Sequence, residues 1–152
     1  MNAVVAVSLR DVTVGMMTAS HDNSGHDAPQ TARAAAILAR RASGLLALEE
    51  AFVELADADC GQAIAALVAE RIRLEAALVL RALEAADDQA ISVMCRAAGF
   101  KINGYSAVLR MRRRHGRGAG SAPTDALTFF SSLSRASAER IIEQLQAVRR
   151  AS

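Results

Sequence analysis

Apolar residues recur along most of this chain at spacings of three and four, the repeat that places side chains on one face of an α-helix. One such stripe consists of Leu45, Leu48, Phe52 and Leu55. The same pattern predicts helices over seven ranges: 29–43, 45–57, 60–85, 88–98, 103–114, 125–133 and 134–150. We therefore predict an all-α fold, a bundle or stacked helical hairpins of about six to seven short helices.

Glycines and polar residues predict where these helices begin and end. Gly44 and Gly99 each follow an apolar stripe, and glycine favours the left-handed backbone just past a helix end. The stretch 60–85 is long for one globular helix, so we expect a break near 70–73. Asn103 is the predicted N-cap of the helix that follows the turn. Gly99 is thus predicted to be a structural turn residue.

Acidic residues predict two further helix starts. Asp59 precedes a helix with Gln62 three residues later, which is the spacing of a reciprocal capping box. Asp87 or Asp88 is expected to end one helix and cap the next. Gly104, by contrast, weakens the helix in which it lies by about 1 kcal/mol relative to alanine.

The length and composition favour one helical domain. The chain has 152 residues, of which 52% are hydrophobic and 3% aromatic. Alanine supplies much of the apolar fraction, and it is the best helix former. Residues 1–28 are predicted to be a flexible leader, because 18–28 are polar and rich in turn residues. Residues 29–152 then form a single all-α domain with a glycine-rich linker at 116–124.

No membrane segment, metal site or cofactor is predicted. The longest apolar run, 63–83, is interrupted by five charged residues, and the N-terminus lacks the leading positive charge of a signal peptide. His21 and His26, both in the leader, are weak candidates for metal ligands. Cys60 and Cys95 stand apart among apolar residues, which favours buried thiols in a reducing cytoplasm.

Charge is unevenly distributed along the chain. Residues 89–124 contain seven cations and no acid, whereas the remainder holds eleven cations and sixteen acids, a net of −5. Such a basic segment can attract phosphate or an acidic partner, or it can be only a solvated helix end. The apolar stripe of its second helix stops at Leu109, so we expect the arginines at 112–114 to be exposed. The cations are Arg96, Lys101, Arg110, Arg112, Arg113, Arg114 and Arg117.

A short helix, a tight turn at Gly99 and a second helix follow one another over 88–114. Apolar residues flank the turn at Met94, Ala98, Phe100, Tyr105 and Val108. This arrangement resembles the DNA-binding helix-turn-helix. The resemblance implies that four side chains face the major groove, namely those of Lys101, Asn103, Ser106 and Arg110. It also implies phosphate contacts from Arg112, Arg113 and Arg114.

Three segments carry a second resemblance, which covers Leu45 to Arg150. They read Leu-Arg-Ala-Leu-Glu-Ala-Ala-Asp at 80–87, Cys-Arg-Ala-Ala-Gly-Phe at 95–100 and Phe-Phe-Ser-Ser-Leu-Ser-Arg-Ala-Ser-Ala-Glu-Arg at 129–140. In these segments the chain resembles the C-terminal part of a bacterial helical family known as domain of unknown function 2336. The resemblance implies an all-helical module whose glycine turn serves packing, and it brings no catalytic residue.

The sequence contains no recognisable catalytic constellation. Histidine is absent from 33–114, and the acidic residues Glu49, Glu50 and Glu54 are interpreted as a solvated outer face. We therefore expect a non-enzymatic cytoplasmic helical interaction or regulatory module with a protein partner, and a homo-oligomer is also compatible. The alternative is a DNA-binding transcriptional regulator that uses the helix-turn-helix at 88–114. The candidate contacts with nucleic acid or an acidic partner are Lys101, Asn103, Ser106, Arg110, Arg112, Arg113 and Arg114.

Overall fold

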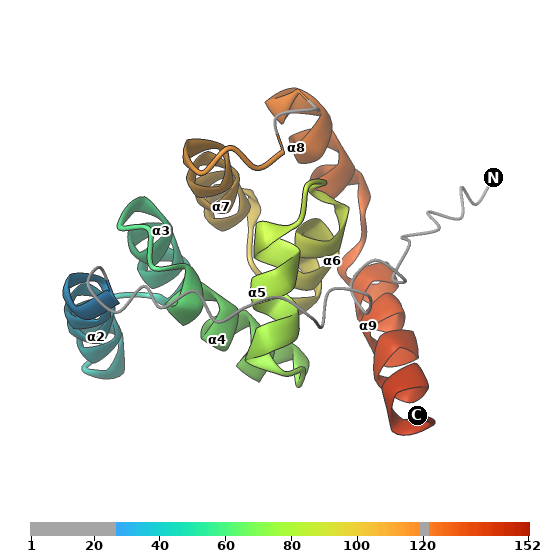
Figure 1. Cartoon of the computed structure of the whole chain (residues 1–152), viewed down its shortest axis with the longest axis horizontal. Helices are drawn as coiled ribbons and strands as arrows, with labels where there is room; N and C mark the ends of the chain where they lie inside the picture. Colours follow the sequence, from blue (N-terminus) through green and yellow to red (C-terminus); the bar gives the residue numbers. More distant parts are fainter. Residues whose placement is uncertain (1–26, 119–121) are drawn as a thin grey trace.

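A computed structural model of the chain describes residues 27–118 and 122–152, and within these ranges the fold is entirely helical (Figure 1). The predicted all-α class is therefore confirmed. The predicted leader lies outside the described residues except for its last two, which begin α2. The helices are α2 (Asp27–Ala42), α3 (Leu48–Asp57), α4 (Gly61–Ile72), α5 (Ala76–Glu84), α6 (Gln89–Ala98), α7 (Ile102–Arg114), α8 (Pro123–Ser132) and α9 (Arg135–Arg150).

Helix breaks fall where the sequence predicts them. The long run 60–85 divides at Arg73, which adopts a left-handed backbone with φ 55°, so the described residues form eight helices rather than seven. Gly44 and Gly99 also have positive φ, 80° and 89°. Within the predicted linker, Pro123 already occupies the first turn of α8, where the missing N–H of proline costs nothing.

Two predicted N-caps are wrong. Asp59 does not cap α4, because its backbone is left-handed, with φ 57°, and Cys60 takes the cap position. Asn103 does not cap α7, because that helix begins one residue earlier, with Lys101 at the cap. For α6, the carboxylate of Asp87 accepts the backbone N–H of Gln89 at 3.0 Å. Local sequence patterns therefore predicted where the helices begin and end more accurately than which residues cap them.

The helices pack mainly as neighbouring pairs. α2 runs antiparallel to α3: Arg40 near the end of α2 pairs with Glu54 of α3 at 2.8 Å, while Gln30 near its start lies beside Cys60. α4 packs on α5, α3 on α7, and α6 on α9. Figure 1 shows α2 and α9 at opposite sides of the molecule, with α5 in front of α6.

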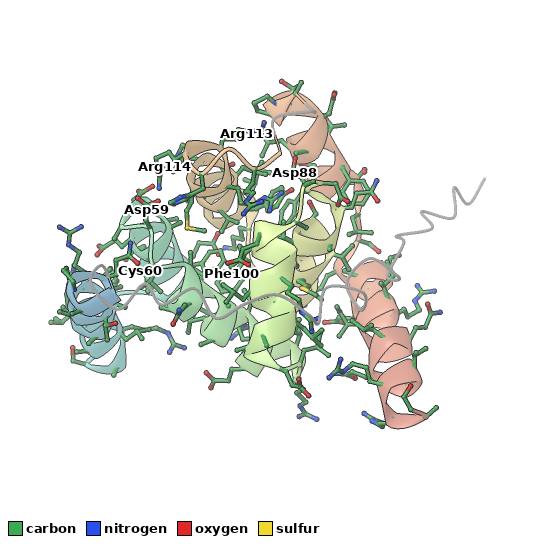
Figure 2. All side chains as sticks on the ribbon, in the orientation of Figure 1. Asp59, Cys60, Asp88, Phe100, Arg113 and Arg114 are labelled. Atoms are coloured by element: carbon green, nitrogen blue, oxygen red, sulfur yellow. The ribbon has the colours of Figure 1, made fainter. Side chains whose placement is uncertain are left out.

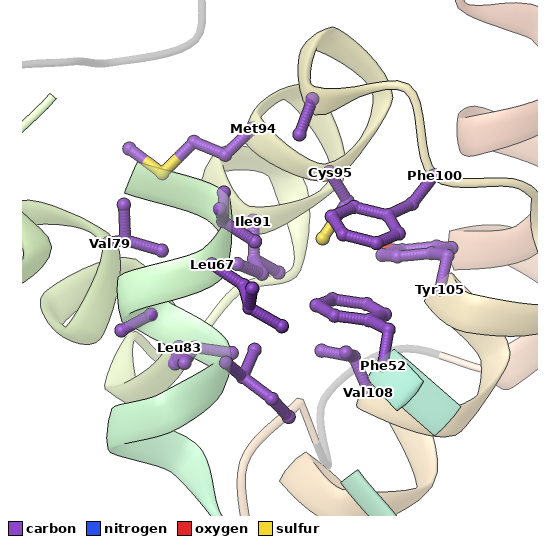
Figure 3. Close-up of a cluster of buried hydrophobic side chains, with 14 of the residues drawn as sticks. Phe52, Leu67, Val79, Leu83, Ile91, Met94, Cys95, Phe100, Tyr105 and Val108 are labelled. Atoms are coloured by element: carbon purple, nitrogen blue, oxygen red, sulfur yellow. The ribbon is translucent and has the colours of Figure 1, made fainter. Parts of the chain in front are cut away.

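Aromatic side chains join the pairs at the centre. The rings of Phe52 and Phe100 stack with centroids 3.8 Å apart, and those of Tyr105 and Phe130 stack at 4.3 Å. All four side chains are at most 2% exposed. Figure 3 shows Phe52, Phe100 and Tyr105 together beside Cys95. Ring stacking therefore ties α3 to the α6–α7 turn, and α7 to α8.

The last helix buries apolar residues over its first three turns, and Arg149 in its final turn pairs with Glu75 at 2.8 Å. Ser134 caps α9 by accepting the N–H of Ser137 at 3.1 Å, and Ile142 and Leu145 are buried as predicted. Val148, however, is 64% exposed, so the predicted apolar face does not extend to the final turn. Gln146 donates to the carbonyl of Ile72 at 2.8 Å and so holds the middle of α9 against the end of α4.

Candidate functional site

The N-terminus of α7 is capped by a carboxylate from a distant part of the chain. Glu49 of α3 accepts the backbone N–H of Lys101 at 3.1 Å and that of Gly104 at 2.7 Å. These N–H groups have no partner within their own helix, and the helix dipole also favours a negative charge there. The interpretation of Glu49 as part of a solvated face is therefore wrong.

Gly104 makes this cap sterically accessible. A Cβ at this position would lie 2.6 Å from Oε1 of Glu49 and 2.9 Å from the ring of Phe52. Both distances are shorter than nonbonded contacts allow. The glycine that weakens α7 in terms of helix propensity therefore permits α3 and α7 to approach closely.

Helices α3 and α7 run parallel and enclose a groove. Glu49 meets the start of α7, whereas Asp57 at the end of α3 pairs with Arg110 at 3.5 Å. Along the open side, the residues of each helix follow helical spacing and line a recess of about 510 Å³. We call it the α3–α7 groove. Its lining residues are Leu46, Glu49, Glu50, Val53, Glu54, Asn103, Ser106 and Arg110.

The structure brings three of the predicted contact residues together in this groove. Asn103 and Arg110 are exposed and Ser106 is partly buried, all on the side of α7 that faces the groove. Lys101, the only lysine of the sequence, is exposed immediately before α7. Their neighbours across the groove are acidic. The lining contains three carboxylates and one guanidinium, a formal charge of −2.

Arg112, by contrast, is part of the protein interior. Its side chain is 1% exposed, and its guanidinium binds the carboxylate of Asp88 at 2.9 Å. It also donates to four backbone carbonyls at the end of α5 and in the α5–α6 loop, those of Ala82, Leu83, Ala85 and Asp87. The expectation that Arg112 is exposed is therefore wrong. Because its guanidinium is buried and bound to the α5–α6 segment, it is not available to a ligand.

The other two arginines of the cluster also meet acids of this chain. Arg113 lies 3.5 Å from Asp88 and is 24% exposed, so its predicted exposure is only partial. Arg114 is 41% exposed and pairs with Asp59 at 2.9 Å, where His115 also approaches at 3.2 Å. Figure 2 shows Arg114 beside Asp59 and Arg113 toward Asp88. The four arginines of α7 are thus all paired with carboxylates from other parts of the chain.

The sequence analysis did not predict the acidic residues that line the groove or pair with the α7 arginines. Glu50 and Glu54 line the groove, and Asp59 and Asp88 bind the arginines. No motif marks these residues, since the pairs are separated by 24 to 55 residues. The available signal was the charge segregation itself. A segment with seven cations and no acid, in a chain whose remainder has a net charge of −5, is balanced most simply by folding onto that remainder.

Neither buried thiol is arranged for chemistry. Cys95 is fully buried, and burial raises the pKa of its thiol far above the ordinary value. Burial also raises the pKa of Cys60. Tyr105 shares a buried hydrogen bond with Ser92, and burial raises its pKa despite that contact. The two thiols therefore stay protonated near neutral pH, and a thiol is a much weaker nucleophile than a thiolate.

Neither a cluster of metal ligands nor a membrane-spanning helix occurs in the described part of the chain. Among residues 27–118 and 122–152, no three histidine, cysteine or carboxylate side chains gather as metal ligands would. None of the helices in the described part of the chain is long and apolar enough to cross a membrane. The histidines of the predicted leader, His21 and His26, lie outside the described residues.

The sequence matches no protein-family model, and the comparisons with curated proteins and with solved structures found no match. The two resemblances described above therefore stay predictions. Two segments that carry one of them do meet in space: Arg96 donates to the carbonyl of Leu133 at 2.8 Å, and the guanidinium of Arg135 lies against Gly99.

Proposed function

We propose that this protein is a non-enzymatic helical interaction module that binds a protein partner through the α3–α7 groove. The observation that carries the proposal is the pairing of the α7 arginines with carboxylates of this chain. A nucleic-acid surface needs cations that can release counterions from phosphates, whereas each α7 arginine already faces a carboxylate of this chain and Arg112 is buried. The groove, in contrast, combines the apolar side chains of Leu46 and Val53 with polar and charged ones, as protein interfaces do.

We further propose that the module works in the cytoplasm. The support is the pair of free thiols, Cys60 and Cys95, both at most 3% exposed. Unpaired cysteines are typical of a reducing compartment. Fractionation of cells that express the protein tests this location, and recovery from an oxidising compartment would contradict it.

The interaction is tested by affinity capture from native cytoplasm with three immobilised proteins. They are the wild type, Ser106→Gln, which narrows the groove, and Ser131→Gln, the same change at an exposed position of α8. We expect a protein that is retained by the wild type and by Ser131→Gln and lost with Ser106→Gln. Retention should be the same in nuclease-treated and untreated lysates. A partner that is insensitive to Ser106→Gln would contradict the use of this groove.

The DNA-binding alternative predicts the opposite results. Selection from random duplexes would then yield one preferred site, bound with nanomolar affinity at physiological salt. Arg110→Ala would remove the preference, because this side chain would read bases. Under our proposal the protein shows at most weak, sequence-independent DNA binding that falls steeply with salt.

A further inference from the structure

We propose that the occupant of the α3–α7 groove is a basic amphipathic helix, an apolar stripe flanked by lysine or arginine, supplied by another protein. This inference rests on the proposed function and adds the chemistry of the partner. It follows from three properties of the groove, namely its shape, its apolar anchor points and its charge.

The shape fits a third helix. Two parallel helices present side chains at helical spacing, Glu50 and Val53 with Glu54 from α3, and Ser106 and Arg110 from α7. A helix that lies between them meets both stripes along its own i, i+3, i+4 and i+7 positions. From Asn103 to Arg110 the groove follows about 10 Å of helix axis, at 1.5 Å per residue. That length accommodates about two turns of a partner helix.

Apolar residues occur in the lining and at one end of the groove. Leu46 and Val53 form the apolar part of the lining. In the described part of the chain the large exposed hydrophobic residues are Leu45, Ile102 and Val148, at 75%, 40% and 64% exposure. Two of these three, Leu45 and Ile102, immediately precede groove residues at the end where α3 and α7 begin. An apolar partner side chain placed there would remove exposed hydrocarbon from water.

The charge of the lining selects a basic partner. Glu49 is engaged as the α7 cap and Glu54 by Arg40, while Glu50 is exposed and accepts only a long contact, 3.3 Å, from the N–H of Ala47. Arg40 and Asp57, which pair with groove residues, cancel each other in charge. The recess therefore keeps its net negative charge. Opposite charge on the partner sets orientation and on-rate, and like charge is repelled.

Two synthetic peptides of about sixteen residues, a length at which alanine-rich helices begin to form, test the inference. Both carry the same stripe of leucines with one tryptophan, and they differ only in having lysines or glutamates beside the stripe. Tryptophan fluorescence reports binding without interference, because the protein contains no tryptophan. We expect the lysine peptide to bind the wild type at least about tenfold more tightly than the glutamate peptide.

The double variant Glu50→Lys with Glu54→Gln should abolish this preference. The matched control is Glu143→Lys with Glu139→Gln, which makes the same change of charge on exposed positions of α9, again four residues apart and with one member in an ion pair. The control should retain the preference. Arg110→Gln removes the one guanidinium of the lining and should strengthen binding of the lysine peptide about two- to fivefold. This variant keeps the test decisive even if the Glu50 variant folds poorly.

Several results would overturn the inference: equal affinity for the two peptides, no binding of either, or a preference that survives in the Glu50 variant. If the wild-type protein forms a dimer and the Glu50 variant is a monomer, the groove binds a second copy of this chain, which would also overturn the inference. If the partner captured through Ser106 presents an acidic or uncharged segment, this inference fails and the interaction module stands. If no captured protein depends on Ser106, the proposed function itself fails.

Discussion

Arg112 and Asp88 form an ion pair in the interior of the protein, with 2.9 Å between the guanidinium and the carboxylate and side chains that are 1% and 8% exposed. The same guanidinium donates to carbonyls at the end of α5 and in the loop that follows. The pair therefore joins α7 to the segment between α5 and α6. The sequence pattern predicts that Arg112 lies at the solvent-exposed end of a helix, whereas its charge is buried in this pair.

Replacement of Arg112 by methionine should destabilise the fold strongly. The change leaves the buried carboxylate of Asp88 without this guanidinium and several backbone carbonyls without their donor. Removal of one partner from a buried pair costs about 3–5 kcal/mol of unfolding free energy. Urea unfolding followed by circular dichroism measures the loss. Arg112→Lys should also be destabilising, because an ammonium group cannot reproduce the planar fork of guanidinium donors.

Arg114→Ser is the matched control for this prediction. Its pair with Asp59 is about two fifths exposed on the arginine side, and such pairs contribute less than about 1 kcal/mol. The double variant Arg112→Met with Asp88→Leu should recover part of the lost stability, since neither charge is then buried alone. An unchanged unfolding midpoint in Arg112→Met would show that this guanidinium does not support the fold.

Gly104→Ala should lower stability although alanine is the better helix former. Propensity alone predicts a gain of about 1 kcal/mol. The added Cβ, however, would stand 2.9 Å from the ring of Phe52, and overpacking of this kind costs about 1–3 kcal/mol. Gly61→Ala, where the Cβ meets no atom within 4 Å, serves as the control and should be neutral or stabilising. Equal effects of the two changes would argue against close packing of α3 on α7.

Gly99→Val should destabilise the protein by more than about 1 kcal/mol. The backbone at Gly99 has φ 89°, a region that a β-branched residue enters only with strain. Its Cβ would also lie 3.2 Å from the guanidinium of Arg135. Gly99→Asn should cost less, because asparagine tolerates the left-handed region. Chemical denaturation of the two variants checks the order, and a valine variant as stable as the asparagine variant would contradict it.

Stability should fall in alkaline solution. Burial raises the pKa of Cys95 and of Tyr105 above their ordinary values of 9.0 and 10.0. The folded state then holds protons that the unfolded state releases, so the free energy of unfolding decreases as pH rises above about 9. Each group contributes at most about 1.4 kcal/mol per pH unit. Denaturation between pH 7 and 10.5 measures the slope, and Cys95→Ala should make it shallower. A slope that is unchanged in this variant would exclude Cys95 as a source.

Much of the local structure could be predicted from the sequence. The stripes at three and four residues located the helices, and Gly44 and Gly99 marked turns that require positive φ. The break in 60–85 was also predictable, because a single helix of that length rarely lacks an interruption. These features depend on residues close together in the chain, and their physical causes act within one or two helical turns.

The roles of the charged residues depend on how the helices pack and could not be predicted from the sequence. Glu49 caps a helix that starts more than fifty residues later, and Arg112 meets Asp88 across the interior. Helical periodicity shows which face of a helix is apolar, but it does not show which helix will cover that face or which charges will then be close. Arg112 continues an apolar stripe, so packing buries it with the stripe. A carboxylate, and carbonyls from the end of α5 and the loop that follows, replace the water it loses.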